Sequence, residues 1–522
     1  MRSRHGAACL AAVLLAALAL SGVGCGKGRG AGGRVVVIGL DGATWELLQP
    51  WIDQGDLPTL ARMQREAAWG EIQSSVPYLS PPAWTTAVTG VNPGKHAIFD
   101  FQRRIPGQVV IVNETAKSRR AQPIWNMLRA AKKRVLIMNV PMTDPPDEVN
   151  GIFIAGFPHF DDVGFTYPPD YEAKLGDYEL DEMEMKLPPG QEDSLLAAYR
   201  TQQAQRRRIV LDWLKNEPFD LLWAVFTASD RVQHTFWVFS DPQNPNYDAA
   251  LARRYGNAMH DLWVEQDRIL SEILQALRPD DTLLLLSDHG FGPLRYDLQV
   301  TQLMRAAGSR LTEREASSVY AITPGDAARL YVARLGRDPG APYTPEEARR
   351  VRDKLAGMLR EARDPATGAR VLERVWANED VFRGTYAEKG PDLVALPDAG
   401  YFVTLGENAP PQSATVVPHS PLLSGWHEMN GIYALRGPAI APGERDGEAG
   451  RLYSLVDVVP SVLYLLGEAI PEGLDGHLMR DLLDPGHLEQ NPPRATGPLE
   501  EDYRETTPEE LENLKNLPYI GG

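Results

Sequence analysis

Six aspartate and histidine side chains in this sequence could together bind divalent metal ions. They are Asp41, Asp230, His234, Asp288, His289 and His427. Asp230 and His234 stand four residues apart, so on a helix they would share one face. Mixed carboxylate and imidazole ligands suit zinc, iron or manganese better than calcium, which prefers oxygen alone. Taken singly, each residue has an ordinary interpretation as a turn former, a cap or a core histidine, so the metal hypothesis rests on the set.

Ser80 is the candidate nucleophile. It precedes Pro81, and the pattern predicts that Ser80 is the N-cap of a helix over 80–88. The structural interpretation is that such a cap stabilises the helix by about 1 kcal/mol. The same position would place the hydroxyl beside free backbone N–H groups and the positive end of the helix dipole, which bind phosphate oxygens and favour an alkoxide. A nearby metal ion would lower the pKa of the hydroxyl further.

Short apolar strands alternate with helical segments along the chain, which indicates an α/β fold with a largely parallel sheet covered on both faces. The predicted strands are 35–40, 134–140, 151–156, 221–226, 283–286, 392–397 and 432–436. The predicted helices are 57–68, 80–88, 192–215, 251–277 and 453–467. Asp41, Asp230 and Asp288 each follow such a strand, and His427 is expected in a Gly-Trp-His turn. Chemistry gathers at the carboxyl ends of parallel strands, so these residues are expected at one edge of the sheet.

One large domain is expected to contain this sheet. We place it over 34–485, with an inserted cap region at about 295–390, where charged helical segments and turn signals replace the alternating pattern. Residues 486–522 are rich in Pro, Glu and Asn. This composition predicts a polar C-terminal tail that lies on the surface or is partly disordered.

The first 25 residues have the layout of an export signal, with a positive start, an apolar stretch over 7–20 and small residues before Cys25. The apolar stretch is shorter than the roughly 20 residues that a membrane-spanning helix needs. Cys25 precedes a Gly-rich linker, 26–33, and resembles the lipid-modified cysteine of bacterial lipoproteins, although Gly22 stands where Leu is usual. We therefore expect an exported protein on the periplasmic or cell-surface side, anchored by lipid at Cys25. Cleavage without lipid and an uncleaved anchor are the alternatives.

Cysteine usage and charge exclude several other kinds of site and partner. Cys9 lies in the apolar stretch and Cys25 is the only other cysteine, so disulfides and thiolate metal sites are excluded from the mature chain. The chain has 53 basic and 70 acidic residues, a net charge of −17. A nucleic-acid partner would need clustered Lys and Arg, so none is expected. This balance does not exclude a basic pocket for a small phosphate.

Five short segments together resemble a known enzyme superfamily. In chain order they are Val-Ile-Gly-Leu-Asp-Gly (37–42), Ser-Pro-Pro-Ala-Trp-Thr-Thr-Ala-Val-Thr-Gly-Val-Asn-Pro-Gly-Lys-His (80–96), Ala-Ser-Asp-Arg-Val-Gln-His (228–234), Ser-Asp-His-Gly (287–290) and Gly-Trp-His (425–427). They resemble the alkaline phosphatase superfamily, in particular its type I phosphodiesterase/nucleotide pyrophosphatase branch and bacterial phosphohydrolases or phosphomutases. The resemblance extends from Arg34 to about Met479. It implies an alkaline phosphatase-like α/β/α sandwich.

The resemblance also implies a two-metal mechanism for hydrolysis of phosphate mono- or diesters. Asp230, His234 and His427 would bind one metal ion. Asp41, Asp288 and His289 would bind the other, with Ser80 bridging toward it as the nucleophile that forms a phosphoseryl intermediate. The expected metal is zinc, with manganese as the alternative, and the expected substrate is a small phosphate ester.

Two departures from related enzymes bear on the substrate. Sulfatases have Cys-x-Pro-x-Arg where this chain has Ser-Pro-Pro-Ala-Trp (80–84), so a sulfatase is disfavoured. Phosphodiesterase members also place an Asn after the nucleophile to hold a phosphate oxygen, and the stretch 97–101 contains none. Lys95, Arg119 and Arg120 are basic candidates for that contact, although exposed basic residues are usually only solvated. Monoester hydrolysis, diester hydrolysis and phosphoryl transfer therefore stay open.

Three other functions use the same residues differently. A phosphotransferase would pass the phosphoryl or head-group phosphate from Ser80 to an alcohol. A mutase would return it to the same substrate, although an exported protein would rarely meet sugar phosphates. A surface module that only binds is disfavoured, because all seven site positions hold chemically competent residues.

Overall fold

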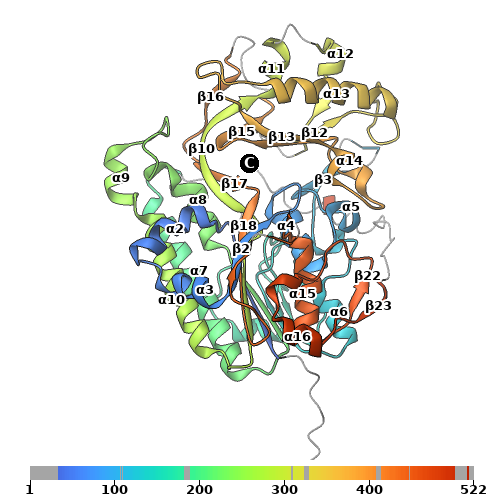
Figure 1. Ribbon diagram of the computed structural model, residues 1–522. Coiled ribbons are helices and arrows are strands. Elements are labelled where there is room, and N and C mark those ends of the chain that lie inside the picture. Colours follow the sequence, from blue (N-terminus) through green and yellow to red (C-terminus); the bar gives the residue numbers. More distant parts are fainter. Residues whose placement is uncertain are drawn as a thin grey trace, which may run out of the picture. The chain divides into compact units, whose positions relative to one another are not determined.

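A nine-stranded sheet runs through the computed structural model of this chain (Figure 1). Its strand order is β19 (Gly443–Glu444), β2 (Ala68–Gln73), β18 (Asn430–Arg436), β9 (Thr282–Leu286), β1 (Val35–Leu40), β8 (Leu221–Phe226), β5 (Val135–Met138), β6 (Gly151–Ile154) and β7 (Thr166–Tyr167). The five strands from β9 to β6 are mutually parallel, whereas β18 and β7 are antiparallel to their neighbours. The predicted α/β class with a largely parallel sheet is therefore confirmed.

The structure describes residues 33–105, 107–108, 110–181, 188–306, 310–322, 328–406, 413–445, 447–448, 450–499 and 514–515. These residues belong to one compact unit that begins at Gly33. The predicted export signal, Cys25 and nearly all of the Gly-rich linker lie outside the described residues, as does most of the predicted tail. Among the helices that are described, none combines the length and the apolar character needed to cross a membrane. The domain boundaries given above stay predictions.

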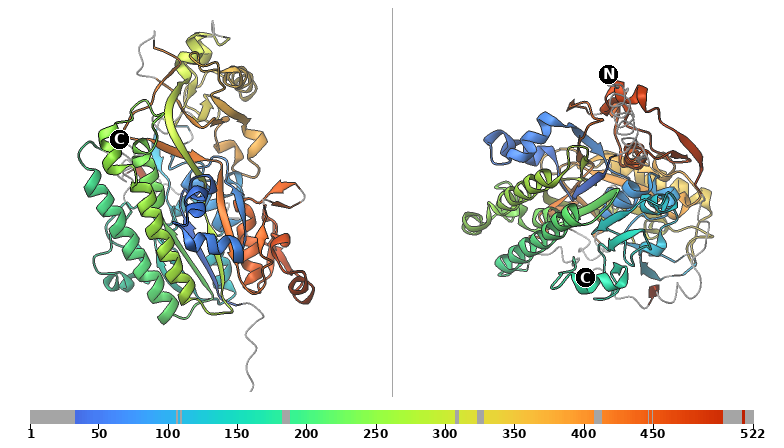
Figure 2. Two further views of the ribbon diagram at one scale, coloured as in Figure 1. Left: turned by 60° about the vertical axis from the view of Figure 1, so that its left-hand side comes forward. Right: turned by 90° about the horizontal axis from the view of Figure 1, so that it is seen from below.

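Helices cover both faces of the sheet because its buried strands are apolar on both sides. Along β1, Val35 and Val37 contribute to one hydrophobic core, whereas Val36, Ile38 and Leu40 contribute to the other. The first core includes α4 (Ser80–Thr89), α6 (Ile124–Ala130) and α15 (Val458–Leu465). The second includes α2 (Trp45–Gln54), α3 (Pro58–Glu66), α7 (Glu192–Asn216) and α10 (Ala258–Ala276). Figures 1 and 2 show the two helical layers on opposite sides of the strands.

The predicted helix over 251–277 is wrong, because the chain forms two helices there. These are α9 (Ala249–Tyr255) and α10, separated at Gly256 and Asn257. A Cβ atom at Gly256 would lie 2.6 Å from the carbonyl oxygen of Ala252 and 3.1 Å from that of Phe239. The first helix therefore ends at a position that leaves no room for a side chain. The predicted helix over 453–467 also begins later, at Val458, after the 3₁₀ turn η5 (Leu455–Asp457).

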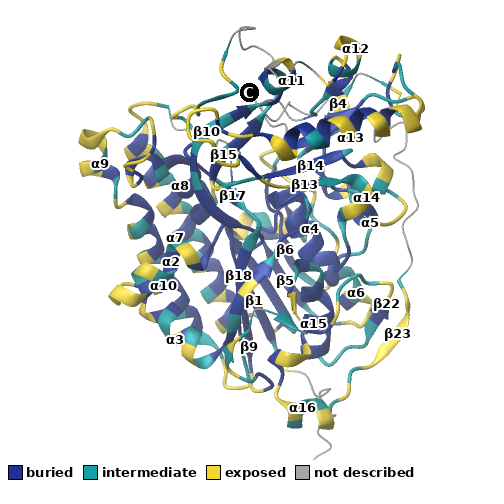
Figure 3. Cartoon of the chain, turned by 45° about the horizontal axis from the view of Figure 1, so that its top comes forward, coloured by how far each residue is buried: buried dark blue, intermediate teal, exposed yellow. Residues whose placement is uncertain are grey.

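A second group of strands continues from the end of β9. Strand β10 (Gly290–Gln299) pairs with β15 (Gly400–Thr404), β16 (Val416–Pro418) and β17 (Gly425–Glu428). Next to it are β11 (Val319–Tyr320), β12 (Arg329–Val332), β14 (Leu393–Pro397) and β13 (Leu372–Ala377), which form another sheet. Helix α13 (Pro345–Glu361) packs on these strands through a separate hydrophobic core. Figure 3 shows buried residues along the strands and exposed ones on the outer sides of the helices.

Candidate active site

Three adjacent strand ends position most of the predicted metal ligands. Asp41 directly follows β1, and Asp288 and His289 follow β9, which is a neighbour of β1. On the other side of β1, β8 leads into α8 (Ala228–Phe236), which carries Asp230 and His234. The prediction that Asp230 and His234 share one helix face is confirmed, because Asp230 Oδ1 lies 3.3 Å from His234 Nε2.

Asp230, His234 and His427 form the first cluster of possible ligand atoms. His427 Nε2 lies 3.3 Å from Asp230 Oδ1 and 3.0 Å from His234 Nε2. Together with the 3.3 Å separation of Asp230 and His234, these distances define a small triangle of three donor atoms. Each residue is at most 6% exposed. Such a triangle can present three lone pairs to one cation.

Asp41, Asp288, His289 and Ser80 form the second cluster. His289 Nε2 lies 3.2 Å from Asp288 Oδ2 and 3.5 Å from Asp41 Oδ1. Ligand atoms of these three residues all lie within 4.8 Å of one another. The Ser80 hydroxyl oxygen lies 3.3 Å from His289 Nε2. The structure therefore brings Ser80 to the same group of atoms as the two aspartates.

The two clusters adjoin each other. The ring of His289 stacks on that of His427 with 3.7 Å between centroids. In addition, single ligand atoms of Asp230, His289 and His427 lie within 4.8 Å of one another. All seven residues predicted for the site thus lie together at the carboxyl edge of the sheet.

Several carboxylate oxygens in these clusters are buried without a hydrogen-bond partner. They are Asp41 Oδ1, Asp230 Oδ1 and both side-chain oxygens of Asp288. Buried carboxylates are costly unless a hydrogen bond or a cation compensates them. Unpartnered carboxylate oxygens that face imidazole nitrogens are the arrangement that a divalent cation would satisfy.

Burial and mutual repulsion shift the pKa values of the three carboxyl groups. Burial, together with the charge of Asp230, raises the pKa of Asp41 to about 8. Burial and the charges of Asp41 and Asp230 raise the pKa of Asp288 well above its ordinary value. Burial would also raise the pKa of Asp230, but His234 and His427 outweigh it and lower that pKa well below the ordinary value. Full ionisation of all three carboxyl groups therefore requires added positive charge.

Neighbouring groups fix the orientation of the ligands. His234 Nδ1 lies 2.9 Å from the carbonyl oxygen of Gly425, and His289 Nδ1 lies 3.1 Å from that of Gly290. Each carbonyl accepts the Nδ1 proton, which leaves Nε2 as the lone-pair donor that faces the cluster. Trp84 Nε1 donates to Asp41 Oδ2 at 3.0 Å. Trp84 was not predicted as a site residue, although it lies in the segment 80–96.

The predicted N-cap role of Ser80 is wrong. Helix α4 has Leu79 as its N-cap, and Ser80 is its first residue, with no side-chain capping bond. The hydroxyl approaches His289 instead, so it does not satisfy a backbone N–H group. It still lies in the first turn, where the helix dipole favours negative charge.

The predicted turn at His427 is also wrong. Gly425 to Glu428 form strand β17, which pairs antiparallel with β10 and places His427 opposite Phe291. The glycine before Trp426 suggested a turn, but it serves close packing here. A Cβ atom at Gly425 would lie 2.4 Å from the carbonyl oxygen of Gln233.

The three basic candidates for a phosphate contact each bind another protein group instead. Lys95 Nζ pairs with Asp475 at 2.5 Å, and Arg119 pairs with Asp147 at 2.6 Å. Arg120 Nη1 donates to the carbonyl oxygen of Lys117 at 2.7 Å. A different basic residue lies beside the ligand atoms: Arg231, whose Nη1 is 3.7 Å from Asp230 Oδ2. The feature of the sequence that could have identified Arg231 is its position between Asp230 and His234 in a single motif.

The sequence model of the type I phosphodiesterase/nucleotide pyrophosphatase family matches residues 35–427. No curated protein sequence matches the chain.

Several solved structures share the fold. Murine ectonucleotide pyrophosphatase/phosphodiesterase 5, an inactive form in complex with AMP, is 14% identical, with a TM-score of 0.52 over 87% of this chain and 100% of that one. The human protein is also 14% identical, with a TM-score of 0.51 over 86% and 100%. Phosphonoacetate hydrolase from Sinorhizobium meliloti, in complex with phosphonoacetate, is 16% identical, with a TM-score of 0.50 over 83% and 95%.

Proposed function

Because the chain belongs to the type I phosphodiesterase/nucleotide pyrophosphatase family, we propose that it hydrolyses small phosphate mono- or diesters through Ser80. The family makes the chain a hydrolase of phosphoric ester bonds, and the nucleophile and the ester class are the proposal. The observation that carries it is the position of the Ser80 hydroxyl, 3.3 Å from His289 Nε2 and in the first turn of α4. AMP and phosphonoacetate, bound by two proteins of the same fold, support a small phosphorus oxyanion as ligand.

Two divalent ions fit the residues of the site. Asp230, His234 and His427 would hold one ion. Asp41, Asp288 and His289 would hold the other, with Ser80 beside it. The fit rests on the unpartnered carboxylate oxygens and on imidazole nitrogens whose other ring nitrogen is already engaged. Zinc is the expected metal and manganese the alternative, because both accept mixed oxygen and nitrogen ligands. When bound, such ions lower the pKa of a neighbouring hydroxyl and stabilise charge on phosphoryl oxygens.

The protein's own groups then divide the reaction into two displacements. In the first, Ser80 Oγ loses its proton and bonds to phosphorus while the ester P–O bond breaks and the alcohol leaves. In the second, water attacks the phosphoseryl group, which releases phosphate, or a phosphate monoester if the substrate is a diester, and restores the hydroxyl. The N-terminus of α4 directs its free N–H groups and dipole at the charge on Ser80 and the phosphoryl group.

Transfer to an alcohol instead of water is the alternative outcome of the same first step. A phosphotransferase or a mutase would use Ser80 and the same metal ligands. Product analysis in the presence of added alcohols separates the two outcomes, because a transferase forms a new phosphate ester and a hydrolase releases phosphate.

We also propose that the chain is exported and anchored to a membrane by lipid at Cys25. The support is the sequence of residues 1–25, with its positive start, apolar stretch and small residues before the cysteine. Full-length protein and Cys25→Ser would be expressed with a radiolabelled fatty acid. Label on Cys25→Ser equal to that on the natural chain would refute the anchor.

The activity test uses Ser80→Ala and three chromogenic esters. We expect wild type supplied with zinc or manganese to release p-nitrophenol from p-nitrophenyl phosphate, from bis-p-nitrophenyl phosphate or from a p-nitrophenyl ester of a nucleotide. Turnover of the first alone, or of the other two alone, separates monoesterase from diesterase. Ser80→Ala should lose turnover by a factor on the order of 10³ or more, because the nucleophile is removed.

The control variant for this test is Ser194→Ala. Ser194 is an exposed serine near the start of α7, so the variant makes the same chemical change away from the site. It should keep wild-type turnover. Equal turnover in Ser80→Ala and Ser194→Ala would refute the nucleophile assignment, and a wild type that turns over none of the three esters would count against the proposed function.

A further inference from the structure

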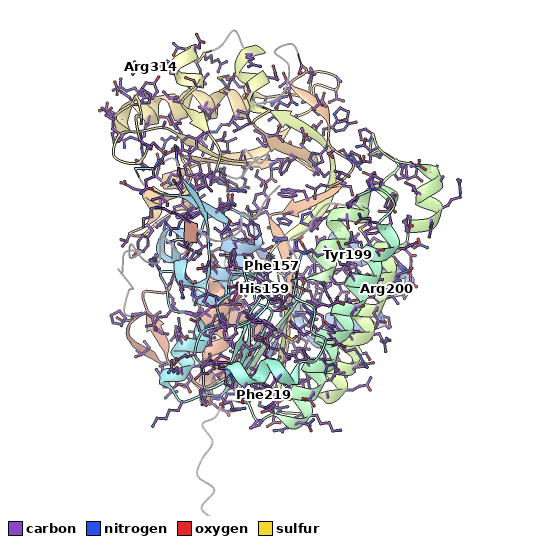
Figure 4. All side chains as sticks on the ribbon, turned by 180° about the vertical axis from the view of Figure 1, so that it is seen from behind. Phe157, His159, Tyr199, Arg200, Phe219 and Arg314 are labelled. Carbon is purple, nitrogen blue, oxygen red and sulfur yellow. The ribbon has the colours of Figure 1, made fainter. Side chains whose placement is uncertain are left out.

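Arg231 is a buried arginine beside the metal-ligand clusters. It lies on α8 directly after Asp230 and is only 4% exposed. Its guanidinium group packs over the ring of Phe157, 4.6 Å from the ring centroid. Phe157 follows strand β6, and Figure 4 shows it at the edge of the sheet opposite Phe219, which precedes β8. The arginine therefore reaches from the end of β8 across the carboxyl edge of the sheet toward the end of β6.

The hydrogen-bonding capacity of Arg231 is not used within the described part of the chain. Nη2 is buried and has no hydrogen-bond partner. Nη1 lies 3.7 Å from Asp230 Oδ2, which is within range of charge attraction but too long for a hydrogen bond. A guanidinium group carries five N–H donors in a rigid fork, and burying them without acceptors is strongly unfavourable. The oxygens of a phosphoryl or carboxylate group are acceptors that this fork is shaped to bind.

Backbone packing holds the aromatic platform in place. Phe157 follows Gly156, and a Cβ atom at Gly156 would lie 2.3 Å from the carbonyl oxygen of Val140. The backbone amide of Met142 donates to the carbonyl oxygen of Phe157 at 2.8 Å. The backbone that carries the ring under Arg231 is therefore held by the segments that follow β5 and β6, which favours one position of the ring before any ligand arrives.

The charge of Arg231 acts on residues of both metal-ligand clusters. It opposes the rise in the pKa of Asp41, which burial and Asp230 cause. It also contributes to the low pKa of His427, although burial is the larger cause. The distances give the placement independently: Arg231 Nη1 lies 3.7 Å from Asp230, whose carboxylate lies within 4.8 Å of ligand atoms of His289 and His427. His289 Nε2 in turn lies 3.3 Å from the Ser80 hydroxyl oxygen.

We propose that Arg231 donates to a non-bridging oxygen of the substrate's phosphoryl group and so supplies the phosphate contact for which the stretch 97–101 holds no asparagine. This inference rests on the proposed function. The reacting phosphoryl group lies between Ser80 and the guanidinium group, with Phe157 supporting the far face of the arginine. Because a charged donor binds the phosphoryl oxygens of mono- and diesters alike, Arg231 contributes to phosphate affinity whatever the leaving group is.

The test compares Arg231→Met and Arg231→Lys with wild type in the zinc-loaded protein. Titration calorimetry with inorganic phosphate gives the affinity, elemental analysis gives the zinc content, and steady-state kinetics give kcat and KM. We expect Arg231→Met to weaken phosphate binding by at least about tenfold with unchanged zinc content, since a charge-assisted hydrogen bond is lost. Arg231→Lys should recover part of the affinity, because it keeps the charge but not the fork.

The matched control is Arg200→Met, which removes the same charge from an exposed position on α7, labelled in Figure 4. It should bind phosphate and zinc as wild type does. Unchanged phosphate affinity in Arg231→Met, or loss of zinc in step with any loss of affinity, would overturn the inference and make Arg231 a counter-ion of Asp230. If Arg231→Met does not fold, phosphate affinity in Arg231→Lys equal to wild type would overturn it. A wild type that neither binds phosphate nor turns over any ester fails the proposed function itself, and the inference with it.

Discussion

Three of the predicted ligands at this site are held by contacts that do not themselves bind metal. Trp84 holds Asp41, and the backbone carbonyl groups of Gly425 and Gly290 hold His234 and His289. The hydroxyl of Ser229 donates to the carbonyl oxygen of Asp41 at 2.7 Å, which joins α8 to the end of β1. Such supporting contacts fix the direction of a ligand, so their loss is expected to weaken metal binding even though no ligand changes.

His96 shows how a buried histidine in a site motif can be purely structural. Its Nδ1 accepts from the backbone amide of Ile98 at 3.2 Å, and its Nε2 lies 3.0 Å from the hydroxyl oxygen of Thr86. Burial, reinforced by the charge of Arg119, lowers the pKa of His96 to about 3. Below pH 6.5, His96 therefore binds a proton in the unfolded chain but not in the folded chain. The free energy of unfolding thus falls as the pH drops.

The low pKa of His96 predicts that the difference in stability between wild type and His96→Gln depends on pH. Between pH 7 and pH 5, His96 should cost wild type about 2 kcal/mol of unfolding free energy, at about 1.4 kcal/mol per pH unit below 6.5. His96→Gln lacks that proton uptake, so its stability should depend less steeply on pH. The measurement is chemical denaturation of both proteins at each pH. Parallel losses of stability in the two proteins would contradict the prediction.

At the scale of elements, the site depends on how strand β1 packs against helix α4. Gly39 on β1 leaves room for the indole ring of Trp84, because a Cβ atom there would lie 2.5 Å from Trp84 Cη2 and 2.8 Å from Val225 Cγ2. Trp84 in turn donates to Asp41. Gly39 thus supports the ligand Asp41, because it leaves room for the Trp84 ring that holds the Asp41 carboxylate.

Gly39→Ala is therefore expected to affect both stability and metal binding. The added methyl group must displace Trp84, with a loss of about 1–3 kcal/mol of unfolding free energy and weaker zinc binding at the Asp41 cluster. The measurements are thermal unfolding and zinc affinity by competition with a chelator. The control is Gly357→Ala in α13, where a Cβ atom meets only Arg310 Nη1 at 4.0 Å. Gly357→Ala should not lose stability, and Gly39→Ala with wild-type zinc affinity would refute the link through Trp84.

The sequence predicted the elements that depend on local pattern better than those that depend on distant pairing. The predicted bounds of β1 and β8 agree with the structure, since each is an unbroken apolar run bounded by polar residues. The pairing of His427 with β10 was missed, because it depends on a partner strand far along the chain. Arg231 was missed for a different reason. A basic residue is usually solvated, and only the fold shows that this one is buried.

At the scale of the whole molecule, the site is assembled from segments spread over most of the chain. Asp41 and His427 lie near the two ends of the range that the family model matches, and strands β1, β8 and β9 must pair before their ligands meet. The buried carboxylates repel one another in the metal-free protein. Metal binding should therefore stabilise the fold as a whole, since only the folded chain presents the complete ligand set.

Removal of metal is expected to lower the midpoint of thermal unfolding. At free zinc of about 100 times its Kd, binding to the folded chain alone adds roughly 2.7 kcal/mol. Unfolding of chelator-treated protein would be measured with and without added zinc, and calcium serves as the control because it prefers oxygen ligands alone. Zinc should restore the midpoint and calcium should not. Equal midpoints in protein with and without bound zinc would contradict a metal site in the core.

The most direct test of Ser80 as the nucleophile is the chemical state of its side chain during turnover. Wild type supplied with zinc would be mixed with the ester it hydrolyses best, quenched in acid and digested. The mass of the peptide that contains Ser80 would then be measured by mass spectrometry. We expect Ser80 to carry the added mass of a phosphoryl group, or of the phosphate monoester if a diester is used. We expect no added mass after chelator treatment. Turnover with the transferred group on another residue, or an undiminished rate in Ser80→Ala, would contradict this assignment.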